Sequence, residues 1–167
     1  FPYQLWLHFQ VVNPGQYISL ADKAFLTTWR TIPMTDSGLY GDLTANDGIL
    51  TARLPGTLQK HRRLVRYLVS TNQKISESVE EISEHQTYFV YNGLPDWYGA
   101  INPKSSLPSV SEKKRFPSSA LNRVPVYHLI SKQEWIEATT WRPSGHPSRS
   151  ANANEYRYSG TLIYDGK

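Results

Sequence analysis

Short apolar stretches recur along the chain and predict a series of β-strands. The predicted strands cover residues 3–12, 48–54, 57–70, 88–91, 126–130 and 156–164. In the first strand, Leu5, Leu7 and Phe9 alternate with other residues and fall on one face. Trp6 and His8 fall on the other face, so we expect neighbouring elements to cover both sides of this strand in part.

The assignment of residues 57–70 to a strand has an alternative. The basic stretch 58–68 also suits a helix. Val65, Tyr67 and Val69 recur at every second position, however, and this period of two favours the strand.

Apolar residues at helical spacing predict two helices, at 19–31 and 73–86. In the first, Ser19 is a suitable N-cap and Asp22 follows in the position of a capping box. The apolar positions of this segment are Leu20, Ala24, Phe25 and Trp29. We expect Pro33 to end the helix, because proline cannot continue one.

The second predicted helix carries an apolar stripe formed by Ile75, Val79 and Ile82. Its acidic residues are Glu77, Glu80, Glu81 and Glu84. Clustered carboxylates can bind a metal ion, but this spacing fits a helix face turned to water better. We therefore predict no metal site there.

Residues 121–142 combine the predicted strand 126–130 with Trp135 and Trp141. Pro125 suits the start of that strand, because proline cannot donate to a sheet ladder. So much apolar and aromatic surface needs cover, and we expect the rest of the chain to pack around this stretch.

Together these elements predict an α+β fold, with a mainly antiparallel sheet packed by about two helices and with long polar loops. The loops are residues 102–119 and 143–154, which are rich in Ser and Pro and are expected to be mobile. A length of 167 residues suits a single domain over residues 1–167.

The composition narrows the possible functions. Tyrosine is frequent, with 11 residues, and serves either ligand binding or the packing of a sheet. The absence of cysteine excludes disulfides, thiolate zinc sites and cysteine nucleophiles. A net charge of +4 permits weak attraction to nucleic acid or anionic lipid but requires neither. We predict no cofactor.

The termini and the apolar runs bear on location. No apolar run reaches the roughly 18 residues that a membrane-spanning helix needs, so we predict no transmembrane segment. The sequence starts at Phe1 without a methionine. We expect that a leader has been removed and that the protein is periplasmic or otherwise exported; a sequence that starts inside its gene is the alternative.

Several aromatic residues are candidates for ligand binding. Trp97 and Tyr98 are adjacent in a loop flanked by Pro and Gly, where large aromatic side chains often stack on sugars or bases. Trp141, Tyr156 and Tyr158 are further candidates for stacking. The alternative is that the aromatic residues of the loop pack on the core.

Residues 60–66 contain the densest basic cluster. Within it, Arg62, Arg63 and Arg66 are the candidates for binding phosphates or a carboxylate polymer. The alternative is a charged strand edge that faces water and discourages aggregation.

The sequence carries no catalytic signature. It contains no nucleophile elbow, P-loop, HExxH pair or dinucleotide-binding motif. His128 and Glu134 could meet across a turn, but nothing marks a nucleophile beside them. A binding role is therefore favoured over catalysis. A single-stranded nucleic-acid-binding domain and a structural subunit of a larger complex are the alternatives.

One resemblance adds to this interpretation. The pattern of Tyr127, Leu129, Ile130 and Trp135, with the strand Gly160-Thr161-Leu162 later in the chain, resembles the core motif of the CsiV-type peptidoglycan-binding proteins of the Gram-negative periplasm. The resemblance covers about a third of the chain. It implies a non-enzymatic binding or assembly factor of the cell envelope that contacts peptidoglycan or a partner protein.

The chain also departs from that motif. In the family, arginine and glutamine normally follow the tryptophan, whereas Ile136 and Glu137 follow here. The family also has a further strand with arginine and histidine after the Gly-Thr-Leu segment, and this sequence ends at Lys167.

Overall fold

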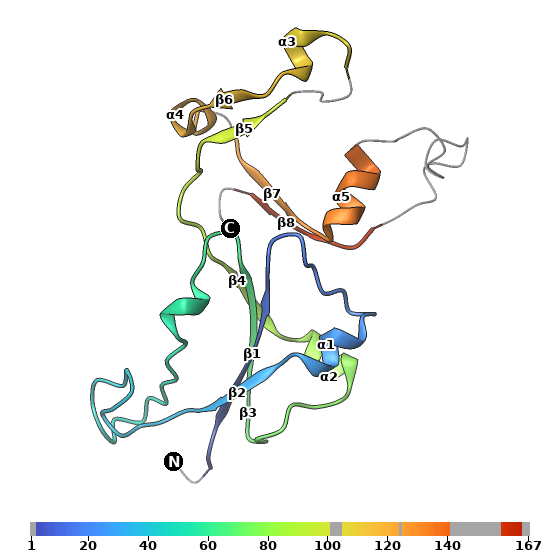
Figure 1. The fold of residues 1–167 in the computed structure, drawn as a ribbon. Coiled ribbons are helices and arrows are strands. Elements are labelled where there is room, and N and C mark those ends of the chain that lie inside the picture. The colour runs from blue at the N-terminus through green and yellow to red at the C-terminus, as the bar shows by residue number, and fades with distance from the viewer. Residues whose placement is uncertain (1–2, 101–104, 124, 141–157, 165–167) are drawn as a thin grey trace.

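The computed structural model describes residues 3–100, 105–123, 125–140 and 158–164 (Figure 1). Its largest element is a four-stranded sheet with the strand order β2-β1-β3-β4. These strands are β1 (Trp6–Val12), β2 (Arg30–Pro33), β3 (Leu64–Ser70) and β4 (Gln86–Phe89). All neighbouring strands run antiparallel, and β1 pairs with β3 along its whole length, from Trp6 opposite Ser70 to Val12 opposite Leu64.

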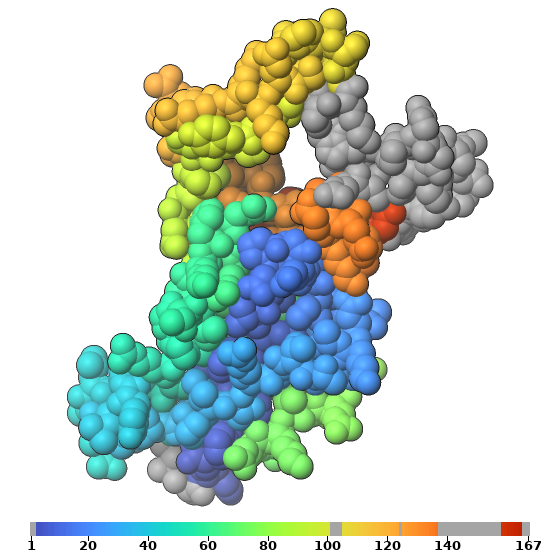
Figure 2. All heavy atoms as spheres, in the orientation of Figure 1, coloured from blue at the N-terminus to red at the C-terminus, as the bar shows by residue number. Residues whose placement is uncertain are grey.

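Two hairpins follow the sheet in the chain. They pair β5 (Trp97–Gly99) with β6 (Lys114–Phe116) and β7 (Tyr127–Ile130) with β8 (Thr161–Tyr164). The α-helices are α1 (Lys23–Thr27), α2 (Val79–Ser83), α3 (Pro108–Ser111), α4 (Ser118–Leu121) and α5 (Gln133–Thr140), and a 3₁₀ turn, η1, spans Gly56–Leu58. In Figure 2 the β5–β6 hairpin with α3 and α4, in yellow to amber, projects from the body that the sheet forms with α1 and α2.

The prediction of a mainly antiparallel sheet is confirmed. The helical part of the prediction is only partly right, because the described residues form five short α-helices where two longer ones were expected. The sheet dominates the fold more than the helices do.

One face of the sheet joins the β7–β8 hairpin to the four-stranded sheet. Val12 and Leu64, which are opposite each other in the β1–β3 pair, form a buried cluster with Ile130 and Ile163. Phe89 of β4 packs against this cluster. The hairpin is therefore attached to the sheet by apolar burial rather than by strand pairing.

The other face of the sheet is covered by the chain that leads into β3. Phe9 and Val65 form a second buried cluster with Leu58 of η1. Leu54 and Tyr88 pack at its margin. Alternate residues of β1 thus pack against two different elements, which confirms the expectation that both faces of this strand are covered.

A polar layer lies beside the first apolar cluster. The guanidinium of Arg66, which is only 3% exposed, donates to Gln10 Oε1 at 2.9 Å and to the carbonyl oxygen of Ile18 at 2.9 Å. It also lies over the rings of Tyr17 and Phe25, at 5.4 and 5.5 Å from their centroids. A buried cation needs such partners, so this contact fixes the segment around α1 against the sheet.

The predicted helix 19–31 is shortened to α1. Asp22 is its N-cap, and the Asp22 carboxylate accepts a hydrogen bond from the Ser19 backbone N–H at 2.8 Å. At the other end, the amide of Gln10 donates to the carbonyl of Phe25 at 3.2 Å and the indole of Trp29 donates to it at 2.6 Å. These side chains take the carbonyl that a longer helix would use, and the chain turns into β2 instead.

The expectation that Pro33 ends a helix is therefore wrong. Pro33 is the last residue of β2, a strand at the edge of the sheet. Proline is tolerated there because an edge strand leaves some N–H groups without a ladder partner.

The predicted helix 73–86 is also shorter and forms only α2. Ser78 caps it by accepting a hydrogen bond from the Glu81 backbone N–H at 3.4 Å. Ile82 is buried, as the apolar stripe predicted. The four glutamates of this segment, Glu77, Glu80, Glu81 and Glu84, are exposed, which confirms that they form the face turned to water.

The strand predicted at 48–54 is wrong, and the strand predicted at 57–70 is right only in its second half. Residues 48–54 form no strand, and only Thr51 makes an isolated bridge, with Thr35. The expected strand 57–70 is formed only from Leu64 onward, because η1 and a turn precede it. The helical alternative for residues 58–68 is also wrong, since Leu64–Ser70 is a strand.

The stretch 121–142 is not the centre of the fold. Its strand, β7, pairs with β8 alone, while the larger sheet is formed by residues before position 90. The predicted polar loop 102–119 contains α3, β6 and the start of α4 in its described part. The second predicted loop, 143–154, lies outside the described residues.

We predict that the Arg66→Leu variant loses about 2–4 kcal/mol of unfolding free energy, because it leaves buried acceptors on Gln10 and Ile18 unpaired. Urea unfolding followed by circular dichroism measures this loss. The matched control is Arg30→Leu at an exposed position of the edge strand, which should change the unfolding free energy by less than about 0.5 kcal/mol. Equal losses in the two variants would contradict the structural role of Arg66.

Candidate functional site

The β5–β6 hairpin exposes two large aromatic side chains. Trp97 is 46% exposed and Tyr98 is 65% exposed. Successive residues of a strand point to opposite faces, so the hairpin is open to water on both sides. The Trp97 ring lies against Phe116 of β6, with the ring centroids 5.0 Å apart. Trp97 and Tyr98, expected from the sequence to bind ligand, are therefore accessible.

Polar contacts link β5, β6 and the start of α4. The Asp96 carboxylate accepts from Arg115 Nε at 2.7 Å and from Nη2 at 2.6 Å. It also accepts from the Ser118 backbone N–H at 2.9 Å, at the start of α4. The Ser118 N–H and then the Arg115 guanidinium hold the pKa of Asp96 below its ordinary value. Arg115 is opposite Tyr98 in the strand pair, so the ion pair lies on the same side of the hairpin as that ring.

The outer face of the β7–β8 hairpin is apolar and exposed. Tyr127 is opposite Tyr164 and Leu129 is opposite Leu162, and these four side chains are between 47% and 64% exposed. The two tyrosine rings stack with centroids 4.9 Å apart. An antiparallel hairpin with one buried face normally turns polar side chains to water on the other. An apolar patch there indicates an interaction surface.

A hollow of about 260 Å³ continues this face toward α5. Trp135 and Tyr158 stack across it with ring centroids 5.6 Å apart, and Leu129 and Leu162 form part of its wall. Lys132 Nζ lies 4.5 Å from the Trp135 ring centroid and is 3.0 Å from Asp22 Oδ1. Tyr158 was expected to stack on ligand, but one face of its ring is already covered by the ring of Trp135.

The predicted basic site is dispersed in the structure. Arg66 is buried in the polar layer, and Arg63 donates to Asn13 Oδ1 at 2.9 Å and to two backbone carbonyls. The guanidinium groups of Arg63 and Arg66 are thus engaged by acceptors within the fold. Arg62 is exposed. Trp141 and Tyr156, the remaining predicted residues, lie outside the described part of the chain.

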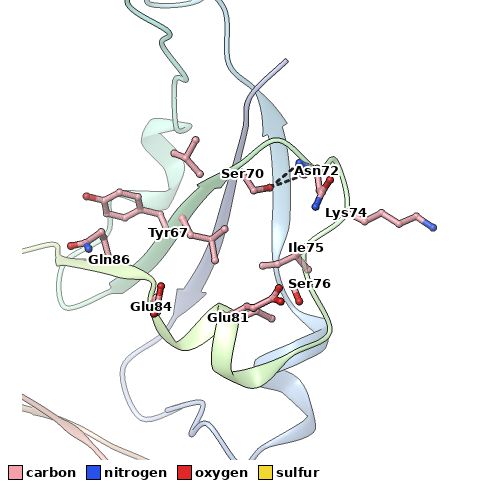
Figure 3. A pocket seen from close by; sticks show the side chains of 12 residues that line it. Tyr67, Ser70, Asn72, Lys74, Ile75, Ser76, Glu81, Glu84 and Gln86 are labelled. Atoms are coloured by element: carbon pink, nitrogen blue, oxygen red, sulfur yellow. Dashed lines mark hydrogen bonds between the residues drawn. The ribbon is translucent and has the colours of Figure 1, made fainter. Parts of the chain in front are cut away.

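A pocket of about 350 Å³ lies between the end of β3 and α2 (Figure 3). Its lining is mixed, and includes Tyr67, Ser70, Asn72, Lys74, Glu81 and Gln86. A tyrosine ring beside amide, carboxylate and ammonium groups suits a polar ligand with an apolar face. Nothing in the sequence pattern marked this pocket, because its residues come from a strand, a loop and a helix that only the fold brings together.

One wall of the pocket contains a serine beside a histidine. Ser70 Oγ is 2.9 Å from His8 Nε2, but His8 Nε2 is also 3.0 Å from the carbonyl oxygen of Asn72. A carbonyl only accepts hydrogen bonds, so Nε2 carries the proton and Nδ1 accepts from the Thr31 hydroxyl at 2.8 Å. An imidazole with its proton on Nε2 cannot remove the proton of Ser70. The pair is a structural contact between β1 and β3.

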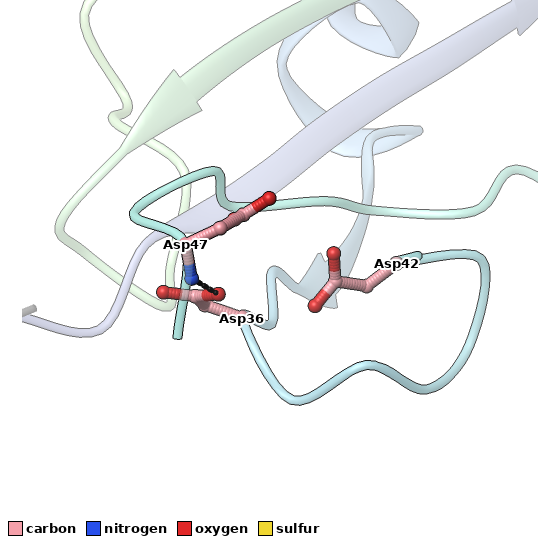
Figure 4. Close-up of side chains that lie close together, drawn as sticks. All are labelled: Asp36, Asp42 and Asp47. Atoms are coloured by element: carbon pink, nitrogen blue, oxygen red, sulfur yellow. Dashed lines mark hydrogen bonds between the residues drawn. The ribbon is translucent and has the colours of Figure 1, made fainter. Parts of the chain in front are cut away.

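Three carboxylates of the 36–48 loop also lie together, those of Asp36, Asp42 and Asp47 (Figure 4). Their oxygens are within 4.8 Å of one another. Asp36 accepts from the backbone N–H groups of Asp47 and Gly48, each at 3.1 Å, and Asp42 accepts from that of Gly38 at 2.8 Å. The carboxylates of Asp36 and Asp42 therefore lie together because they accept hydrogen bonds from the backbone of the loop and stabilise its shape.

No helix in the described part of the chain is long and apolar enough to span a membrane. Comparison of the chain with protein-family models, curated proteins and solved structures gives no match.

Sequence reasoning missed the exposed face of the β7–β8 hairpin. Residues 126–130 and 156–164 were predicted to be strands, and the described strands within them are Tyr127–Ile130 and Thr161–Tyr164. A segment rich in apolar residues at successive positions indicates apolar side chains on both faces of the strand. It does not reveal that one of those faces lacks a cover, because that depends on which elements pack nearby.

The assignment of the proton in the serine–histidine contact can be tested with a fluorophosphonate probe, which labels activated serines. We predict no adduct on Ser70 by mass spectrometry, because His8 holds its proton on the nitrogen that faces the serine. A stoichiometric adduct on Ser70 would show that the pair is catalytic.

The stability of the protein should also depend on pH. Burial is the main cause that lowers the pKa of His8, His61, His85 and His128. The unfolded chain, with pKa values near 6.5, then binds more protons than the folded chain as the pH falls. We predict that the unfolding free energy is highest above about pH 6.5 and decreases toward about pH 5. Urea unfolding across this range checks the sign, and a constant or rising free energy would contradict it.

Proposed function

We propose that this protein is a non-enzymatic binding or assembly factor of the cell envelope, and that it contacts peptidoglycan through the β5–β6 hairpin. The observation that carries the proposal is the exposure of Trp97 and Tyr98 on a short hairpin that is open on both faces. Large aromatic side chains are unfavourable in water, and a ligand that covers them gains favourable free energy from their burial.

Polar groups at the same hairpin favour a carbohydrate ligand. Sugar rings have apolar faces that stack on aromatic rings and hydroxyl groups that need hydrogen-bonding partners. Arg115 and Asp96 supply donors and acceptors on the side of the hairpin that carries Tyr98, because Arg115 is opposite Tyr98 and is paired with Asp96. A preorganised set of this kind loses little conformational entropy on binding.

The location in the envelope is supported by the resemblance found in the sequence. The residues that carry it, from Tyr127 to Trp135 and at 160–162, come together in one unit formed by β7, α5 and β8. Residues that form one structural unit are more informative than the same residues scattered over the fold. An exported protein that acts at the cell wall is consistent with this grouping.

A role without catalysis is supported by the serine–histidine contact described above. Its imidazole is in the tautomer that donates to Ser70 and Asn72, so it cannot act as a general base toward the serine.

A second candidate is an assembly role in which a partner protein covers the outer face of the β7–β8 hairpin. The specific observation in its favour is the pair of leucines, Leu129 and Leu162, between the stacked tyrosines and the hollow at Trp135. Leucine offers a sugar no hydrogen bond, and apolar side chains of this kind are typical of the buried centre of a protein interface.

Single-stranded nucleic acid is less well supported. Two of the three arginines expected to bind phosphate, Arg63 and Arg66, are held by contacts inside the chain. A nucleic-acid groove needs cations that follow the backbone of the ligand. Binding of an oligonucleotide that weakens steeply with added salt would revive this function.

Co-sedimentation with purified sacculi tests the proposal. We predict that the protein sediments with sacculi, and that the double variant Trp97→Ala/Tyr98→Ala reduces the affinity by at least about tenfold, the loss typical of two aromatic anchors. The matched control is Tyr127→Ala/Tyr164→Ala, which removes an equal number of exposed rings from the other hairpin and should keep the affinity within about threefold.

Each pattern of results has one meaning. Recovery of the unaltered protein that is equal with and without sacculi rejects peptidoglycan as the ligand. Loss of binding only in the Tyr127/Tyr164 variant moves the site to the β7–β8 hairpin. Circular dichroism of both variants establishes that the fold is retained.

A further inference from the structure

The side of β3 that faces β4 is paired over only part of its length. On its other side, β3 pairs with β1 along all of Leu64–Ser70. β4 pairs with residues 64–67 alone, because its first residue, Gln86, is opposite Tyr67. β4 therefore offers no hydrogen-bonding partner to residues 68–70, at the end of β3.

The backbone of Val69 presents its hydrogen-bonding groups at this unpaired edge. The carbonyl of Arg63, just before β3, accepts from the Val90 N–H at 2.8 Å on the side of β4. In a strand the N–H and C=O groups of every second residue point to the same side, so those of Val69 also point to the side of β4. The Val69 side chain is 47% exposed. An accessible strand edge without a partner is a template for pairing with another chain.

The cavity of about 350 Å³ between β3 and α2 lies along the same edge (Figure 3). If the β3–β4 register continued, Glu84 would be opposite Val69. Glu84 is instead the C-cap of α2, and both residues line the cavity. The cavity therefore occupies the place of the missing strand pair. Its volume is within the range of sites that bind small ligands.

The cavity carries negative charge that the protein does not neutralise. Glu81 and Glu84 line it on the side of α2, and Figure 3 shows the Glu81 carboxylate turned toward the loop that carries Ile75. The Lys74 side chain extends away from the cavity in the same view. The ion pairs of the described residues involve neither glutamate. Two carboxylates without a cationic partner favour a ligand with a positive charge.

The other walls suit an organic cation better than a metal ion. A metal ion needs several ligands that converge on one point. Among the described residues, no convergent group of three carboxylate or imidazole ligands includes Glu81 or Glu84. The Tyr67 ring and the side chains of Leu68 and Ile75 supply apolar wall. An ammonium group on an apolar stem matches both the carboxylates and this wall.

We propose that the cavity binds a short, extended peptide that carries an ammonium group, either a lysine side chain or the N-terminus of the peptide. The peptide backbone pairs with Val69 as an added strand at the edge of β3. Its ammonium group lies by Glu81 and Glu84, and its apolar atoms lie against Tyr67 and Leu68. The site is separate from the β5–β6 hairpin and does not depend on the proposed function.

The test follows the backbone amide signals of the full chain by ¹⁵N NMR during titration with short peptides. The lysine probe is acetyl-Ala-Lys-Ala-amide, the N-terminal probe is Ala-Ala-Ala-amide, and the neutral control is acetyl-Ala-Ala-Ala-amide. We expect a saturable downfield shift of the Val69 amide proton, which marks a new hydrogen bond. The dissociation constant of at least one ammonium probe should be at least about tenfold lower than that of the neutral control. The probe that binds more tightly identifies the source of the ammonium group.

Three variants separate the site from general attraction between charges. Glu81→Gln/Glu84→Gln should reduce the advantage of the ammonium probe over the neutral control to about twofold or less. The matched control, Glu77→Gln/Glu80→Gln, removes equal charge from residues that do not line the cavity and should keep the advantage. Val69→Pro removes an N–H that the β1–β3 pair does not use and should abolish binding of every peptide.

Circular dichroism establishes that each variant keeps its fold, and the two glutamate variants carry the test if Val69→Pro unfolds. The proposal is overturned if no ammonium probe gives a saturable shift at Val69, or if the two glutamate variants lose the advantage equally. Full binding by a folded Val69→Pro variant overturns it as well, because strand addition needs the Val69 N–H.

Discussion

The contact between the Arg66 guanidinium and Gln10 is the constraint on which the rest of the fold depends. A cation inside a sheet is tolerated only if each donor finds an acceptor. Gln10 meets this need through its oxygen and uses its amide nitrogen to bind carbonyls and a hydroxyl in the segment 24–28. One polar pair therefore sets the register of β1 against β3 and also sets the place where α1 ends.

This arrangement divides the chain into a part that is buried by its own elements and a part that is not. The four-stranded sheet has cover on both faces, from α1 and the β7–β8 hairpin on one side and from the segment around η1 on the other. Within the described residues, the two hairpins have no such cover on their outer faces, where aromatic and apolar side chains are exposed. The surfaces available for binding are thus a consequence of where the core ends.

Sequence patterns predicted the elements whose apolar residues recur with a clear period or run in the sequence. The alternation in residues 3–12, the stripe at Ile82 and the apolar run at 126–130 each correspond to an element of the structure. The helix 19–31 was predicted too long, because its end is set by Gln10, which is distant in sequence. The exposure of Trp97 and Tyr98 was left open by the sequence, since a loop that packs on the core has the same composition.

The candidate sites show the same limit. Arg62, Arg63 and Arg66 are neighbours in sequence, but β3 turns Arg66 into the interior while Arg62 remains at the surface. His61 and His128 are far apart in the chain, and in the structure both rings contact that of Tyr91. The side chains of adjacent residues can thus lie far apart and those of distant residues can lie together. The face of the sheet to which a side chain points decides its neighbours.

The central claim is that the aromatic rings of the β5–β6 hairpin bind an envelope glycan. The most direct measurement is the indole N–H signal of Trp97 in ¹⁵N NMR during titration with soluble peptidoglycan fragments. The indole of Trp29 serves as an internal reference, since it donates to Phe25 inside the fold. The account predicts a saturable shift of the Trp97 signal while that of Trp29 stays unchanged. An unchanged Trp97 signal at saturating fragment, or equal shifts of both indoles, would contradict it.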